Sequence, residues 1–228
     1  MIGREETDDP RQVTFISWVD FVRVEGKQYI NAAAGTPFGD CVGRGLSPSD
    51  LGQPYTCVQF QVSGSVRDDL SYVSKDGDAA FLPVGTVIYR VRDYSPAFRL
   101  AAWRTCPTGE ELCLYEVDSS PEAQRGADLL DIDDRAQSIR ILSAQDGRTE
   151  LGRVDAAEQI QALVGMILSA SVDQLRHEHD GPQYFLAFVL HDGTAVKRSY
   201  WPESRELSRG ILLPIDFRDT VLAGLPRL

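Results

Sequence analysis

Between Val13 and Val117 the apolar residues fall into short β-rich runs separated by turns, and helical spacing is missing throughout this half. The runs are Val13–Val24, Tyr55–Val62, Ala79–Phe81, Thr86–Val91, Phe98–Trp103 and Leu112–Val117. In the first run both alternating faces carry apolar side chains, as expected of a strand covered on two sides or of a bent barrel strand. The pattern predicts an all-β, barrel-like domain over residues 11–118.

The pattern changes after an acidic, mostly polar stretch at residues 119–134, which we interpret as a linker between two domains. Two hairpins with Asp-Gly turns then alternate with two amphipathic segments. The predicted strands are Ser138–Leu142, Thr149–Val154, Tyr184–Leu190 and Thr194–Trp201, and the first predicted helix covers residues 156–170. Residues 135–228 are thus predicted to form a two-layer α+β sandwich of order ββαββα, with both helices on one face of an antiparallel sheet.

Two local features complete this prediction. Asp155 and Asp216 each precede an amphipathic segment and suit a helix N-cap, because a carboxylate oxygen can accept a hydrogen bond from the first free backbone amides. Residues Pro202–Arg209 are interpreted as a loop inserted between the last predicted strand and the last helix.

Charge restricts the partners of the chain. Its 34 acidic and 23 basic residues give a formal net charge of −11 over 228 residues. Because phosphate binding draws its energy from Lys and Arg, nucleic acid and anionic membranes are not expected as partners. No apolar run approaches the roughly 18 to 20 residues needed to cross a bilayer, so no transmembrane segment is predicted. The first ten residues also lack the apolar core of a signal peptide, which indicates either a cytoplasmic protein or an exported one whose targeting segment has been removed.

The four cysteines show no zinc spacing and no neighbouring histidine. Cys106 and Cys113 flank a Pro-Thr-Gly turn, so a short hairpin could bring their thiols within bridging distance. A bridge between Cys41 and Cys57 would tether the Gly- and Pro-rich segment that lies mostly between them. We predict these two disulfides, with buried free thiols as the alternative.

No group of residues predicts catalysis from sequence alone. His177 and His179 are two residues apart, which suits a metal only on an extended backbone, and we interpret them as a solvated helix end. Asp20 and Asp78 can act as an acid and a base only if folding brings them together in a cleft. We therefore predict no catalytic residue, no metal site and no cofactor.

Aromatic and arginine side chains gather around the turns of the β-rich half. Such residues are more often core than binding residues, but interfaces are enriched in both types. The predicted recognition surface consists of Trp18, Tyr89, Arg92, Tyr94, Phe98, Arg99 and Trp103.

Three segments of this half carry a resemblance: Ile16 to Phe21, the string Asp-Gly-Asp-Ala-Ala-Phe-Leu-Pro-Val-Gly-Thr-Val-Ile-Tyr that ends at Tyr89, and Tyr94 to Leu100. Together they resemble uncharacterised secreted proteins and lipoproteins of Gram-positive-type bacteria, over residues 13–103. The resemblance implies an exported protein whose signal or lipobox cysteine has been trimmed, and it implies no activity.

These observations predict a non-catalytic, extracytoplasmic binding or regulatory protein whose partner is a cell-surface protein or glycan. The alternative is a hydrolase of cell-wall or carbohydrate material that uses paired carboxylates in a cleft between the domains, and a third possibility is a cytoplasmic protein with free thiols. A cleft lined by paired buried carboxylates would favour the hydrolase, and an exposed aromatic patch without them would favour the binding protein.

Overall fold

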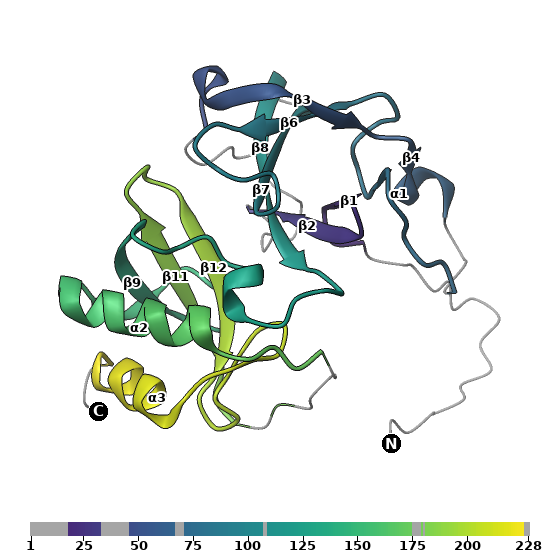
Figure 1. Cartoon of the computed structure of the whole chain (residues 1–228). Helices are drawn as coiled ribbons and strands as arrows, with labels where there is room; N and C mark the ends of the chain where they lie inside the picture. The colour runs from purple at the N-terminus through teal and green to yellow at the C-terminus, as the bar shows by residue number, and fades with distance from the viewer. Residues whose placement is uncertain are drawn as a thin grey trace.

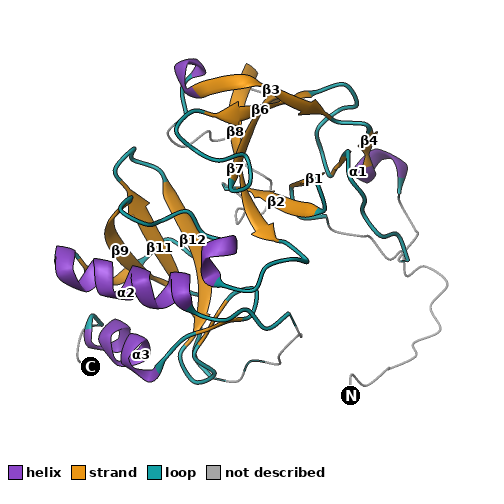
Figure 2. Ribbon diagram, viewed as in Figure 1, coloured by secondary structure: helices purple, strands orange, loops and turns teal. Residues whose placement is uncertain are grey.

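The computed structural model describes residues 18–32, 46–66, 71–106, 109–174, 179 and 181–225. Residues 13–17 of the first predicted strand, Cys41 and His177 lie outside the described residues. The described chain forms an eight-stranded sheet and a six-stranded sheet, and its two longest helices lie beside the smaller sheet (Figures 1 and 2). The fold is therefore mostly β, consistent with an α+β protein.

The larger sheet is built from residues 21–119 and is curled (Figure 1). Its strands, in spatial order, are β3 (Leu51–Cys57), β6 (Val87–Val91), β7 (Arg99–Cys106), β8 (Gly109–Ser119), β2 (Lys27–Asn31), β1 (Phe21–Val24), β5 (Asp78–Ala79) and β4 (Phe60–Gln61). A helical turn, η1 (Pro48–Asp50), and a short helix, α1 (Val62–Ser65), accompany them. This half is mainly β, as predicted, but not purely so.

The chain itself brings the two edges of this sheet together. Strands β3 and β4 lie at opposite ends of the spatial order, yet only Val58 and Gln59 separate them in the sequence. The Val58 amide donates to the Thr86 carbonyl beside β6 at 2.9 Å, and the Gln59 amide donates to the Gly77 carbonyl before β5 at 2.8 Å. One continuous segment thus contacts both edges, which accounts for the curl of the sheet.

Strand β7 is covered on both of its faces. Leu100 and Ala102 belong to the main core, whereas Ala101, which points to the opposite face, packs with Leu112 and Leu114 in a smaller cluster. The apolar side chains on both faces of this strand therefore reflect burial on both sides.

The smaller sheet contains, in spatial order, β10 (Glu150–Val154), β9 (Ala136–Ser143), β11 (Tyr184–Leu190), β12 (Ala195–Trp201), β13 (Glu206–Leu207) and β14 (Ile211–Leu212). Helices α2 (Ala157–Ser169) and α3 (Ile215–Ala223) lie in front of it in Figure 1. The ring of Phe217 in α3 meets the ring of Tyr200 in β12, with centroids 5.4 Å apart. No helix of the described residues is long and apolar enough to cross a membrane.

The predicted order ββαββα is not the observed one, because β13 and β14 stand between β12 and α3. The segment Pro202–Arg209, predicted as a loop, contains β13, and Arg209 and Gly210 turn the chain into β14 with φ angles of 73° and 76°. Glu206 pairs with Trp201 of β12 on one side and with β14 on the other. Strands of two residues carry no periodic signal, so the sequence pattern does not reveal them.

Neither predicted helix cap forms. Helix α2 begins after Ala156 and α3 after Pro214, and no side chain makes a cap hydrogen bond at either position. Asp155 therefore lies one residue before the cap of α2 and is exposed. Asp216 lies inside the first turn of α3, where a negative charge still interacts favourably with the helix dipole.

The acidic stretch at residues 119–134 alternates between exposed and buried residues and is not solvated throughout. Its buried apolar residues are Ala123, Leu129, Leu130 and Ile132. The Gly126 amide donates to the Ala170 carbonyl at 2.9 Å, and a Cβ at Gly126 would lie 2.0 Å from the Ile167 carbonyl oxygen. Gly126 is therefore needed because α2 comes too close for any side chain. A single core cluster includes residues of this stretch and of both sheets, and the division into two domains stays a prediction.

The buried stripe of α2 makes a testable prediction about stability. Leu163 is 1% exposed, so we expect Leu163→Ala to lower the free energy of unfolding by about 2 to 5 kcal/mol through lost transfer energy and a cavity. Asp155→Ala, which removes no cap bond, should change it by no more than about 0.5 kcal/mol. Urea denaturation followed by circular dichroism measures both. A Leu163→Ala protein as stable as the parent would contradict the observed packing of α2.

Candidate functional site

The structure distributes the predicted recognition residues over several parts of the molecule. Trp18 packs against the rings of Phe21 and Tyr72, with centroids 6.2 and 6.4 Å away. Phe98 borders the main core, and Trp103 borders the smaller cluster on the opposite face of β7. These three rings therefore belong to three different apolar clusters.

The remaining four predicted residues lie nearer to one another. Tyr89 is half-buried on β6, and the exposed Arg92 donates from Nε to the Leu51 carbonyl at 2.9 Å. Tyr94 and Arg99 are in direct contact, since the guanidinium carbon of Arg99 lies 4.3 Å from the centre of the Tyr94 ring. This contact is part of a larger network.

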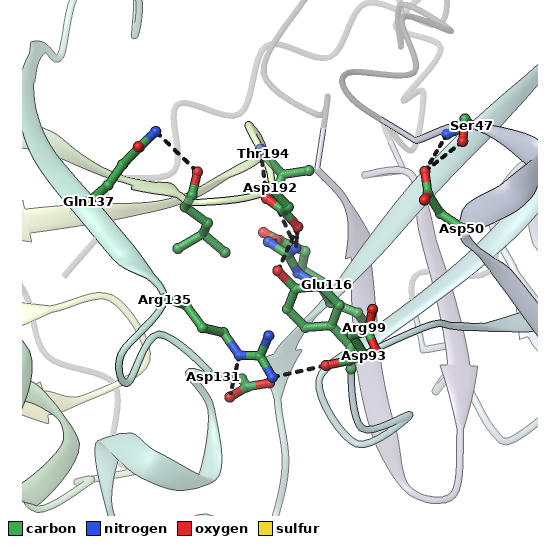
Figure 3. A network of polar contacts seen from close by, with 12 residues as sticks. Ser47, Asp50, Asp93, Arg99, Glu116, Asp131, Arg135, Gln137, Asp192 and Thr194 are labelled. Carbon is green, nitrogen blue, oxygen red and sulfur yellow. Dashed lines mark hydrogen bonds and ion pairs between the residues drawn. The ribbon is translucent and has the colours of Figure 1, made fainter.

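Arg99 lies at the centre of a polar network where the two sheets meet (Figure 3). Its side chain is 3% exposed and donates to Glu116 Oε1 at 2.5 Å and to Thr194 Oγ1 at 2.9 Å. Asp192 Oδ2 lies 3.4 Å from Arg99 Nη1 and also accepts the hydroxyl of Tyr94 at 2.6 Å. The network thus ties β7 and β8 to the turn between β11 and β12.

A second arginine reinforces this junction. The guanidinium carbon of Arg135 lies 4.4 Å from the centre of the Tyr94 ring. Arg135 also donates to the Asp93 carbonyl at 2.9 Å and lies 3.3 Å from Asp131 (Figure 3). Two cations therefore contact one aromatic ring, and each cation has a carboxylate close by.

The ionisation of the network follows from these contacts. Burial and the hydrogen bond to Asp192 raise the pKa of Tyr94 to about 12. Burial alone would raise the pKa of Asp192, but hydrogen bonds from Thr194 and Tyr94 outweigh it and lower that pKa. The network is a satisfied structural junction rather than an open binding site.

The junction makes a pH-dependent prediction. We expect Asp192→Ala to lower the free energy of unfolding by about 1 to 3 kcal/mol at pH 7, because it removes charge-assisted hydrogen bonds. Since the folded pKa of Asp192 is lowered, its contribution is present above the unfolded pKa of about 4 and is lost as the pH falls through the folded value. Denaturation of parent and variant between pH 3 and 7 should show the difference shrinking on acidification, and Tyr94→Phe, which loses one bond but keeps its ring, should lose less. A constant difference across this range would contradict the assignment.

Asp20 and Asp78, considered from sequence as an acid and base pair, lie in separate hydrogen-bond networks. Asp20 accepts from Asn31 Nδ2 at 2.8 Å and from Arg104 Nη1 at 2.9 Å, and burial raises its pKa. Asp78 accepts from the Tyr72 hydroxyl at 2.7 Å. Each carboxylate has its own donors, and the described contacts do not join the two into a catalytic pair.

Both predicted disulfide pairings are wrong, because Cys57 and Cys113 are free thiols. The register of the β7–β8 hairpin opposes Cys106 to Gly109, so Cys113 lies well along β8 and its thiol cannot reach Cys106. Cys41, the other predicted partner of Cys57, lies outside the described residues. Burial raises the pKa of the Cys113 thiol to about 11, which makes it a poor nucleophile.

A cleft of about 570 Å³ opens between the end of β8 and the strands β12 to β14. Its charged and aromatic lining residues are Asp118, Asp173, His179, Phe185, Lys197, Arg198, Trp201, Glu206 and Arg209. The cleft falls within the size range of small-molecule sites and combines apolar rings with groups that can hydrogen bond.

Carboxylates in this cleft contact cationic or ionisable partners. Asp118 forms an ion pair with Arg209. Glu206, with a side chain 5% exposed, lies with Oε1 3.5 Å from His179 Nε2. The other ring nitrogen of His179, Nδ1, lies 3.3 Å from the Ser204 hydroxyl. His179 is thus oriented on both sides.

Two aromatic rings form part of the cleft wall. The imidazole of His179 stacks on the indole of Trp201, with centroids 3.9 Å apart and an angle of 13° between the planes. The Lys197 ammonium lies 5.3 Å from the centre of the Phe185 ring. His179 therefore belongs to the cleft wall and not to a helix end, because α2 stops at Ser169.

Sequence reasoning finds none of these cleft residues as a group. They come from the end of β8, from residue 179 and from the short hairpins after β11, and no spacing links them. The comparison with protein families finds no matching model, and the comparisons with curated proteins and with solved structures find no match either.

Proposed function

We propose that this protein is a non-catalytic binding protein and that the cleft beside β12 takes one or two sugar units of a cell-surface glycan. One observation carries the proposal: the cleft joins the rings of Trp201 and Phe185 to oriented polar side chains in about 570 Å³. Aromatic rings offer the apolar contact that a sugar ring can pack against, and the polar groups offer hydrogen bonds to its hydroxyls.

The alternative of hydrolysis by paired carboxylates has less support. That chemistry needs one carboxyl group kept protonated by its surroundings beside a second, ionised one. In this cleft Asp118 lies against Arg209 and Glu206 against His179, so both of these carboxylates have a cationic or ionisable partner. These contacts favour binding over this mechanism.

The proposed location outside the cytoplasm rests on the resemblance to secreted proteins and lipoproteins. The cysteines support either compartment. Cys106 is disulfide-bonded, as is usual in an oxidising compartment, whereas Cys57 is an exposed free thiol, as is usual in a reducing one. Sugar binding by the cleft is independent of the compartment, whereas a cell-surface glycan as the ligand requires export.

A sugar-binding screen tests the proposed function. We expect a thermal-shift screen of mono- and disaccharides to find a ligand, and isothermal titration to show that Trp201→Ala lowers its affinity by about tenfold, as the loss of one aromatic contact should. Trp103→Ala is the control, since Trp103 is also half-buried but lies outside the cleft lining. Binding that tolerates Trp201→Ala, or no binding by any sugar, would reject the proposal.

A second candidate function, nucleophilic hydrolysis, is favoured by one observation. The Ser204 hydroxyl, the His179 imidazole and the buried Glu206 carboxylate stand in the order of a nucleophile, its base and the group that orients the base. The two separations, 3.3 and 3.5 Å, exceed the range of about 2.6 to 3.2 Å expected for proton transfer, so this function ranks second.

A fluorophosphonate probe decides this second function. If Ser204 is a nucleophile, its oxygen bonds to phosphorus as fluoride leaves, and mass spectrometry locates the adduct on Ser204. Labelling should then disappear in Ser204→Ala and persist in Ser208→Ala, which changes a serine of the cleft lining. A parent protein that takes no label is not a serine hydrolase of this kind.

A further inference from the structure

Arg198 is a buried cation in the wall of the cleft. The residue is 9% exposed, and its guanidinium donates to the Val117 carbonyl at 2.7 Å and to the Lys197 carbonyl at 3.0 Å. Both acceptors are neutral, and among the residues that the structure describes no carboxylate forms an ion pair with it. A buried charge is costly unless an opposite charge lies close. The carboxylates of Glu116 and Asp131 line a small cavity together with Arg198, but neither forms an ion pair with it.

The other charges of the cleft differ in how far they reach solvent. The carboxylates of Asp118 and Glu206 have side chains only 13% and 5% exposed. Arg209, the partner of Asp118, has a side chain 45% exposed, and Lys197 is half-buried. Asp173 is half-buried as well, so Arg209 is the most exposed charged side chain among these residues of the cleft lining.

The charge of Arg198 is opposite in sign to the net charge of the whole molecule. The chain carries a net charge of −11 and has three lysines, one of which is Lys197. A protein with so large an acidic excess repels anions over most of its surface. A buried arginine without an ion pair in the cleft of such a protein then indicates a preference for an anion at that place.

We infer that the glycan unit bound in the cleft is acidic, carrying a carboxylate, sulfate or phosphate group that Arg198 neutralises and that Arg209 contacts. This inference rests on the proposed function and names its ligand class. Arginine suits the role because its planar guanidinium can donate two parallel hydrogen bonds to such a group.

A matched set of sugars tests the inference. Isothermal titration would compare glucose, glucuronate and glucose 6-sulfate, which share a ring and differ in charge, and a separate titration would use inorganic sulfate. We expect the acidic sugars to bind about tenfold or more tightly than glucose, and this preference to weaken with added salt. Arg198→Met, which keeps much of the volume but removes the charge, should abolish the preference.

Two controls separate loss of charge from loss of fold. Arg198→Lys keeps a cation and should retain part of the preference, and Arg153→Gln removes an exposed arginine that pairs with Glu150 and lies outside the cleft lining. Thermal melting of each variant shows that it is folded. An Arg198→Met protein that melts far below the parent is replaced in the titrations by Arg209→Gln, which should reduce the preference through an exposed side chain.

The outcomes distinguish the two proposals. Equal affinity for glucose and glucuronate overturns the acidic-ligand inference and leaves sugar binding intact. Binding of inorganic sulfate as tight as that of the sulfated sugar, with no sugar contribution, overturns sugar binding and supports the anion site. No binding of any probe overturns both.

Discussion

The junction of the two sheets depends on how the charge of Arg99 is neutralised. The arginine comes from β7, and Glu116 on the neighbouring β8 supplies one countercharge within the same sheet. The remaining donors need acceptors, and Thr194 and Asp192 on the β11–β12 turn provide them. A buried guanidinium with free donors is costly. The second sheet must therefore lie against the first for all of these hydrogen bonds of Arg99 to form.

Tyr94 holds the charged side chains of this junction in place. Its ring lies against Arg99 and Arg135, and its hydroxyl is held by Asp192 (Figure 3). The residues that looked most like a recognition surface in the sequence are therefore partly used for assembly within the chain. Aromatic rings and arginines serve internal and external interfaces through the same physics, so composition alone does not separate the two roles.

Arg198 is also a buried cation, but its hydrogen-bond partners differ from those of Arg99. The guanidinium of Arg198 donates to the Val117 carbonyl near the end of β8 and to the Lys197 carbonyl in its own strand. Arg99, in contrast, contacts the carboxylates of Glu116 and Asp192. Carbonyl oxygens satisfy the hydrogen bonds of Arg198 and leave its charge in place. Arg99 therefore belongs to a structural junction, whereas Arg198 lines a cleft with room for a ligand.

The local elements and the overall charge follow from the sequence alone. The apolar runs of the second segment predicted β11 at its observed bounds and β9, β10 and β12 within a few residues. The helical spacing predicted α2 to within one residue at each end. Both predictions succeed because periodicity reflects which near neighbours are buried. Three features emerge only in the folded chain: the closure at Val58 and Gln59, the register that separates Cys106 from Cys113, and the cleft. Those features depend on partners far apart in the chain, such as Arg99 and Thr194 at a separation of 95 residues, and no local pattern specifies which distant group will neutralise a buried charge.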